Sequence, residues 1–240
     1  MKACIRQPFQ RAFTLIELLV ILFTVAVIAC FLIPAIVREP RRSKTVACVN
    51  NLKQVGLAFR VWSIDNGDLF PMGISTNGVV TNYPASITPP VAAHSETNGP
   101  GSKEFIDSGL AYVHLQLLSN ELGVPNVLVC PNDKAKTIAT NFYSALTDKN
   151  VSYFVGTDAN DPFPNMLLSG DRHLAFGNQP LKTGLFVLTT NNPALSWAGT
   201  SHGPFGNVGL ADGSVQTFSS RRLAEAARYQ ELATNRLAIP

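Results

Sequence analysis

The feature that most constrains this chain is an apolar segment near its amino terminus. Residues 13–37 contain one charged side chain, Glu17, and the twenty residues from Leu18 to Val37 contain none. Twenty helical residues at about 1.5 Å each match the roughly 30 Å hydrocarbon core of a bilayer. The sequence therefore predicts a membrane-spanning helix over 13–37 and argues against a purely soluble protein.

The charge distribution is uneven only at the start of the chain. Lys2, Arg6 and Arg11 lie in the first twelve positions, which contain no acidic residue, and the remaining residues balance to zero formal charge. Nucleic-acid binding requires clustered Lys and Arg that release counterions, and no such stripe follows. We therefore expect no nucleic-acid partner. Basic residues flank both ends of the apolar segment, so charge alone leaves its orientation open.

A distinctive motif surrounds the start of the apolar segment. After a short basic leader, residues 11–20 read R-A-F-T-L-I-E-L-L-V. This closely resembles the processing site of type IV pilins and type II secretion pseudopilins, where a prepilin peptidase cuts after a small residue at the cytoplasmic face and methylates the new amino terminus. The resemblance implies a cut between Ala12 and Phe13, although the family prefers glycine where this chain has Ala12.

Two residues of the apolar segment acquire roles from this resemblance. A carboxylate one turn inside an apolar helix is costly and usually has a partner. For Glu17 the resemblance implies the Phe13 amine of a neighbouring subunit, which would set the stagger of packed helices; the alternative is a Glu17 that reaches the membrane interface alone. Pro34 lacks a backbone N–H, and the resemblance implies that it bends or locally opens the helix during assembly.

A second helix is predicted from about Ser43 to Asn66. Its apolar residues recur at spacings of four and three and share one face: Cys48, Leu52, Val55, Phe59 and Trp62. Together with the apolar segment this predicts one continuous helix of about 80 Å. The expected organisation is a leader, a transmembrane and filament-core helix, its amphipathic continuation, and an exported globular head, over 1–12, 13–37, 38–66 and 67–240.

The rest of the chain predicts a mixed head. Residues 66–109 are rich in loop-forming residues, 109–122 look helical, and 221–236 look like a C-terminal helix. Strands are predicted over 151–156, 166–169, 185–190, 207–211 and 214–218, the last two joined as a hairpin by a type I′ turn at Asp212-Gly213. The predicted fold class is α+β and pilin-like, with a long N-terminal helix packed on a mostly antiparallel head.

Several short motifs in the head resemble one branch of pilin-like proteins. Cys48 begins C-V-N-N-L-K-Q-V-G, and the later pieces are V-C-P-N-D at 129–133, V-S-Y-F-V-G at 151–156 and S-G-D-R at 169–172. The last is a head motif in which His202 is followed by nine residues and then Asp212-Gly213.

The cysteines bear on compartment and metal binding. Cys48 and Cys130 are the only two in the head, and an exported domain with two thiols favours a disulfide, the alternative being two buried free thiols. A zinc site with four Cys or His ligands is not expected, because the two cysteines and the scattered histidines show no C-x-x-C or H-x-x-x-H spacing; the histidines are His94, His114, His173 and His202. We expect no cofactor, although the oxygen-rich run 158–161 keeps calcium as an alternative.

The resemblance implies a structural subunit of a type II secretion pseudopilus, or of a type IV pilus, with its head on the exported side of the inner membrane. Its implied partners are the prepilin peptidase, other filament subunits, the assembly machinery and lipid. His202 and Asp212 could be read as an acid–base pair. However, His202 precedes a Gly/Pro-rich connection into a hairpin, and Asp212-Gly213 suit its turn, so a hydrogen bond and turn geometry explain them and no enzymatic activity is expected. Two alternatives stay open: a membrane-anchored binding or enzymatic domain that does not polymerise, and a lipoprotein acylated on Cys30 of V-I-A-C.

Overall fold

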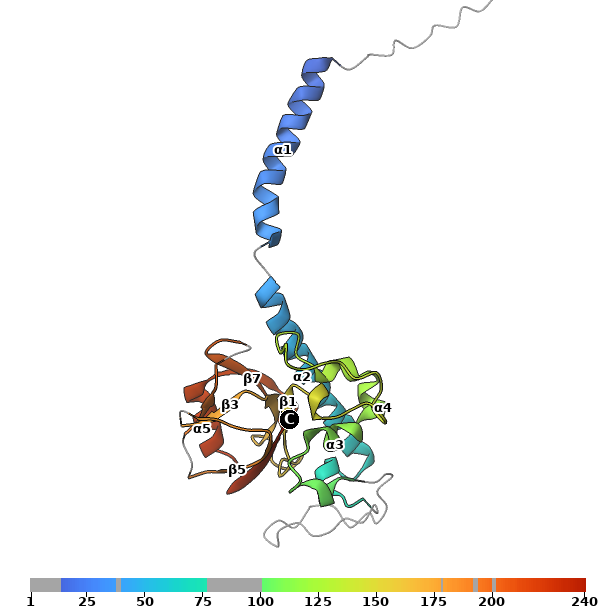
Figure 1. The fold of residues 1–240 in the computed structure, drawn as a ribbon, viewed down its shortest axis with the longest axis vertical. Helices are drawn as coiled ribbons and strands as arrows, with labels where there is room; N and C mark the ends of the chain where they lie inside the picture. The colour runs from blue at the N-terminus through green and yellow to red at the C-terminus, as the bar shows by residue number, and fades with distance from the viewer. Residues whose placement is uncertain (1–13, 38–39, 77–100, 178, 192–193, 200–201) are drawn as a thin grey trace, which may run out of the picture. The chain divides into compact units, whose positions relative to one another are not determined.

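The computed structural model describes residues 14–37, 40–76, 101–177, 179–191, 194–199 and 202–240, with no side-chain description for 31–37 and 40–43 (Figure 1). The chain divides into two compact units, residues 1–43 and 44–240.

The first unit contains the helix α1 (Leu15–Val37), and the side chains of Thr14 and Glu17 cap its first turn. Glu17 Oε2 accepts hydrogen bonds from the N–H and the hydroxyl of Thr14, at 3.0 and 2.9 Å, and Thr14 Oγ1 accepts from the N–H of Glu17 at 3.4 Å. This reciprocal pattern is a capping box, which satisfies N–H groups left free at a helix start. Glu17 therefore has a partner within its own chain.

The predicted pilin-like fold class, with one long N-terminal helix packed on a head, is wrong. The described chain instead has two separate helices, α1 and α2 (Pro40–Asp65), followed by antiparallel sheets and short helices in a mixed α+β arrangement. The second helix begins at Pro40. Proline lacks the N–H that a continuing helix needs, disfavours helical geometry in the residue before it, and suits the first turn of a new helix.

From Lys44 onward, α2 contributes one face to the core of the second unit. The five side chains predicted to share a face are all buried: Cys48, Leu52, Val55, Phe59 and Trp62. They recur at helical spacing, so the buried side of α2 follows directly from the sequence. The opposite side carries Lys53 in solvent, together with Arg60, which forms an ion pair with Asp161.

Two antiparallel sheets form the rest of the second unit (Figure 1). The larger has the order β5-β9-β1-β2-β7-β8, and its strands are Gly184–Thr189, Thr234–Ile239, Tyr153–Gly156, Leu167–Asp171, Phe205–Leu210 and Val215–Ser219. The smaller has the order β4-β3-β6, from Gln179–Pro180, Leu174–Phe176 and Leu195–Trp197. Each predicted strand corresponds to a strand of the larger sheet, whereas β3, β4, β6 and β9 were not predicted.

Short helices complete the second unit. They are η1 (Pro71–Gly73), η2 (Lys103–Phe105), α3 (Ala111–Gln116), α4 (Ser119–Leu122), η3 (Pro125–Leu128), η4 (Asp148–Asn150) and α5 (Ser220–Arg228). The helix predicted over 109–122 is therefore split into α3 and α4, and Gly123, at φ 69°, ends α4. Only part of the predicted helix 221–236 forms, because its last residues pair with β5 and β1 as β9. Sheet pairing here overrides local helix propensity.

The larger sheet separates two apolar clusters. Successive side chains of a strand point to opposite faces, and in β1 this places Phe154 in one cluster and Val155 in the other. The cluster around Val155 includes Val55 and Phe59 of α2, while the cluster around Phe154 includes Leu223 of α5. Both faces of the sheet are therefore covered.

The buried His114 predicts acid sensitivity of the second unit. Its side chain is fully buried with Nδ1 2.7 Å from Ser102 Oγ, and burial lowers its pKa from 6.5 to about 4. Between these two values the unfolded chain binds the extra proton. The free energy of unfolding should therefore fall as the pH drops through this window, by up to about 3 kcal/mol.

The variant His114→Gln keeps a polar side chain beside Ser102 but does not titrate. Urea unfolding of both chains between about pH 7 and pH 4 measures the slope of stability against pH. We expect a flatter slope for the variant, whatever its absolute stability. Equal slopes would show that His114 does not carry the acid sensitivity.

Candidate functional site

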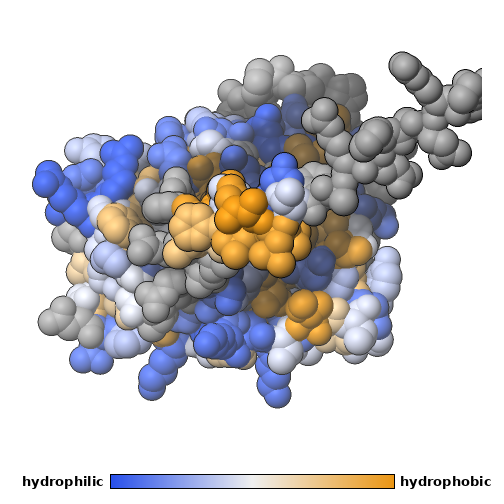
Figure 2. Space-filling view, turned by 90° about the horizontal axis from the view of Figure 1, so that it is seen from above, coloured by the Kyte–Doolittle hydropathy of each residue, from blue (hydrophilic) through white to orange (hydrophobic). Residues whose placement is uncertain are grey.

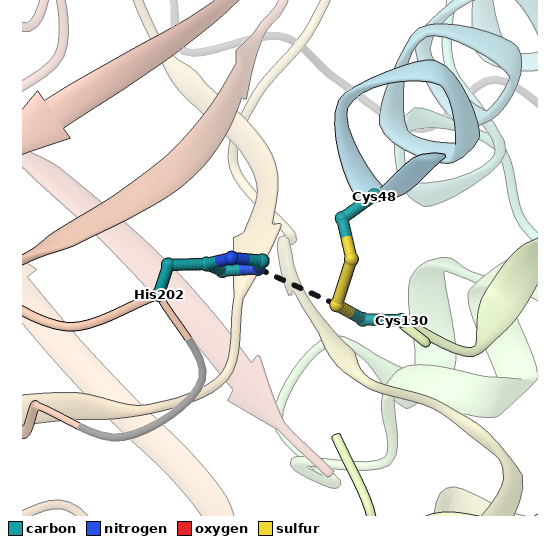
Figure 3. Close-up of side chains that lie close together, drawn as sticks. All are labelled: Cys48, Cys130 and His202. Atoms are coloured by element: carbon teal, nitrogen blue, oxygen red, sulfur yellow. Dashed lines mark hydrogen bonds between the residues drawn. A yellow bond between two sulfur atoms is a disulfide. The ribbon is translucent and has the colours of Figure 1, made fainter. Parts of the chain in front are cut away.

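The motif residues of the head meet where α2 crosses the larger sheet. Cys48 of α2 and Cys130, which follows η3, form a disulfide with a Cα–Cα distance of 5.0 Å (Figure 3). Both side chains are buried, and Leu52 and Tyr153 pack around them. Asn51 also donates a hydrogen bond from Nδ2 to the carbonyl of Val129 at 3.1 Å. The pieces C-V-N-N-L and V-C-P-N-D are therefore one packed unit.

His202 lies against this disulfide. Its ring points at the sulfur pair, with Nε2 3.4 Å from Cys130 Sγ (Figure 3). On the other side of the ring, Nδ1 lies 3.3 Å from Thr45 Oγ1 and 3.2 Å from Asn132 Nδ2. The imidazole therefore touches α2, the segment after η3 and the sheet, and its side chain is only 3% exposed.

The sheet contributes Asp171, the last residue of β2. Its Oδ2 lies 3.6 Å from His202 Nε2 and accepts hydrogen bonds from the backbone N–H and the amide of Asn207, at 2.7 and 3.1 Å. Burial raises the pKa of Asp171 to about 7, and burial lowers the pKa of His202. Both shifts oppose charging, so the contact is better described as a neutral polar pair than as an ion pair.

The neighbouring Arg172 connects the end of β2 to the segment after η3. Its Nε and Nη2 donate to the two carboxylate oxygens of Asp133 at 2.7 and 3.1 Å. Burial alone would raise the pKa of Asp133, but the guanidinium of Arg172 outweighs that effect and lowers it. This two-point contact fixes S-G-D-R of β2 against C-P-N-D.

The second half of the head motif is a turn that contacts α2. Gly213 has φ 84° and donates to the carbonyl of Leu210 at 3.0 Å, while Asp212 Oδ1 accepts from the N–H of Ser214 at 2.8 Å. The predicted type I′ turn is wrong, because that turn needs positive φ at both central residues and Asp212 lacks it. A Cβ built on Gly56 of α2 would lie 3.5 Å from Gly213 Cα, so the helix backbone approaches the turn closely.

The motif therefore contacts α2 at two places: His202 at Thr45 and Gly213 at Gly56. These α2 residues are eleven positions apart, which is about 16 Å of helix. His202 is beside Asp171 rather than paired with Asp212, whose carboxylate accepts from the N–H of Ser214 within its own turn. The arrangement thus provides attachment of α2 to the sheet.

A small depression opens beside His202. Its lining combines polar and aromatic residues: Asp171, His173, Trp197, Gly199, His202, Gly203 and Phe205. Ser201, the residue before His202, lies outside the described residues.

The run considered for calcium has its oxygens committed to other groups. Asp158 accepts from the backbone N–H of Arg236 at 2.7 Å and from its guanidinium, and Asp161 pairs with Arg60. Asn160 Oδ1 accepts from the N–H of Phe70 at 2.8 Å. The geometry of these residues gives calcium no support.

The structure describes only some of the candidate site residues near the amino terminus. Ala12 and Phe13 lie outside the described residues, and Pro34 lies in the part of α1 whose side chains are not described. Cys30 is a free, exposed cysteine within α1. In the part of the chain that the structure describes, no helix has both the length and the apolar character needed to cross a membrane.

Comparisons with known proteins give no further assignment. No protein-family model, no curated protein and no solved structure matches the chain.

Sequence reasoning missed several residues of the site. Asp171, Arg172, Asn132 and Asp133 lie within quoted motifs, yet none was named as a candidate. Thr45 gave no signal of its own, because a threonine on an amphipathic helix is ordinary. The available signal was that each short motif holds a polar residue beside an apolar one, which suits a buried polar contact.

Proposed function

We propose that this chain is a filament subunit of the type II secretion pseudopilus or type IV pilus kind, cleaved by a prepilin peptidase between Ala12 and Phe13 and methylated on Phe13. One observation carries the proposal: the sequence R-A-F-T-L-I-E-L-L-V directly precedes seventeen further uncharged residues. The small residue at the cut, the Glu at its fixed distance and the apolar run occur together. In this role the chain has no catalytic function.

The start of α1 supports this position of the cut. Thr14 is the N-cap residue and α1 begins at Leu15, so cleavage after Ala12 would leave one residue before the helix cap. The new amine would then lie next to the Thr14–Glu17 capping box. A mature amino terminus placed there would be near the Glu17 of its own chain. It could also pair with the Glu17 carboxylate of a neighbouring subunit.

The surface of α1 supports an environment of lipid or of other helices. Its described large apolar side chains are exposed, from 40% at Val27 to 82% at Leu15. The space-filling view shows a group of apolar residues near its centre (Figure 2). A continuous apolar surface of this kind requires a nonpolar partner. In the proposed function the helix lies in the inner membrane before assembly and among the helices of other subunits afterwards, with the second unit on the exported side.

A second candidate is a membrane-anchored domain that does not polymerise. The observation that favours it is the compact second unit, which has its own two apolar clusters and its own disulfide. Acylation on Cys30 has less support, because α1 continues beyond Cys30 to Val37. A lipid-bearing cysteine would instead begin the mature chain.

Processing is tested with variants of Ala12, because the peptidase must fit the side chain before the cut. With a prepilin peptidase present, we expect Ala12→Gly to be cleaved at least as well as the natural chain, and Ala12→Leu to be cleaved at least about tenfold more slowly. Intact mass spectrometry measures the fraction of chains that have lost residues 1–12 and gained one methyl group. Equal cleavage of all three, or acylation at Cys30, would contradict the assigned site.

A further inference from the structure

The cluster in Figure 3 contains three good metal ligands that the filament function does not use. We propose that the dithiol form of this chain binds one thiophilic cation, with Zn²⁺ as the reference ion, through Cys48, Cys130 and His202. Their ligand atoms all lie within 4.8 Å of one another. Thiolate and imidazole are the ligands that zinc prefers in proteins.

The position of His202 already matches that of a ligand. In a tetrahedral zinc site, with sulfur at about 2.3 Å and nitrogen at about 2.0 Å, the two ligand atoms lie roughly 3.5 Å apart. The observed distance from His202 Nε2 to Cys130 Sγ is 3.4 Å. After reduction of the disulfide, the two sulfur atoms would have to separate to roughly 3.8 Å to occupy two corners of the tetrahedron.

The surroundings supply further elements of a metal site. Asp171 Oδ2 lies 3.6 Å from His202 Nε2 and accepts two hydrogen bonds from Asn207, so it borders the site without belonging to the three-residue ligand group. The hydroxyl oxygen of Thr45 lies 3.3 Å from the other ring nitrogen, Nδ1, and can accept its N–H. A ligating histidine commonly donates its second N–H in this way, which fixes its ring and tautomer.

Cys48 and Cys130 would bind the metal in their reduced state and form the disulfide in their oxidised state. A newly made chain carries two thiols, and zinc binding releases one proton from each. A disulfide oxidoreductase of the exported compartment would then accept two electrons, form the S–S bond and release the ion. The metal form and the disulfide form thus exclude each other, and His202 is adjacent to the sulfur atoms in both.

The test uses the full chain in detergent micelles, reduced with a phosphine and mixed with an equimolar amount of Zn²⁺. After desalting, we expect about one zinc per reduced chain and almost none per oxidised chain, measured by atomic emission. Co²⁺ in place of zinc should show a thiolate charge-transfer band together with strong tetrahedral d–d bands. A reduced natural chain that retains no metal would overturn the proposal without recourse to any variant.

Variants locate the ion. His202→Ala should weaken zinc binding at least about tenfold, and Cys48→Ser should remove the thiolate band or abolish binding. His173→Ala is the matched control, because His173 lines the adjacent depression but is not among the three ligands, and it should retain the metal. Metal that survives both ligand variants, or that is lost only in His173→Ala, would place the ion elsewhere and refute the site.

Discussion

Replacing Glu17 with glutamine is expected to abolish filament assembly while leaving the start of α1 intact. Glutamine can take the place of Glu in a capping box, so it can still accept the hydrogen bonds from Thr14. It cannot provide the negative charge that would attract a neighbour's amine in a low-dielectric environment. Assembly should therefore fall to background, while cleavage, insertion and folding of the second unit stay close to the natural chain.

The capping box provides the matched control. Thr14→Ala removes the N-cap side chain at a cost of about 1 kcal/mol but keeps the carboxylate. It should therefore assemble better than Glu17→Gln. Filament yield and cysteine crosslinks between α1 helices of neighbouring subunits measure the difference. If Glu17→Gln assembles normally and only Thr14→Ala fails, Glu17 acts as a helix cap alone and the membrane-anchored domain becomes the better hypothesis.

Reduction of the Cys48–Cys130 disulfide is expected to produce the largest loss of stability in the second unit. The bridge joins residues 82 positions apart. Closing a loop of that length restricts the unfolded chain by up to about 4.5 kcal/mol in the chain-entropy model. The free energy of unfolding should fall by a comparable amount under reductant, with chelator present so that no cation binds the thiols.

Tryptophan fluorescence can follow this unfolding in urea, because Trp62 and Trp197 both lie in the second unit. Cys30→Ser is the matched control: Cys30 is exposed and unbridged, so its loss should not change the midpoint. The expectation fails if reductant leaves the midpoint of the natural chain unchanged, or if Cys30→Ser shifts it as much as reduction does.

The sequence was most informative where one periodicity decided the structure. Helical spacing identified the buried face of α2, because burial of one helix face depends on residues a few positions apart. It was misleading at Pro40, where two apolar patterns were joined into one helix although proline favours a new start. It also failed over 234–239, because the helix-like pattern there says nothing about the distant strands that β9 pairs with.

The candidate site was only partly predictable for the same reason. Cys48, Cys130 and His202 could be named from their residue types, but their contact depends on a separation of 72 positions between Cys130 and His202. Asp171 could not be named as the partner of His202, because Asp212 lies nearer in the sequence and belongs to the same motif. Tertiary placement, rather than motif membership, decides which carboxylate faces the imidazole.

The position of β9 has a consequence for the order in which the larger sheet can form. This strand, Thr234–Ile239, follows every other described strand in the sequence, yet it lies between β5 and β1, and among the described strands β5 pairs only with β9. The sheet thus remains incomplete until residues 234–239 are available. If the chain is exported as the proposed function requires, the second unit up to residue 233 would cross the membrane with the sheet still open, and the arrival of β9 would join β5 to the rest.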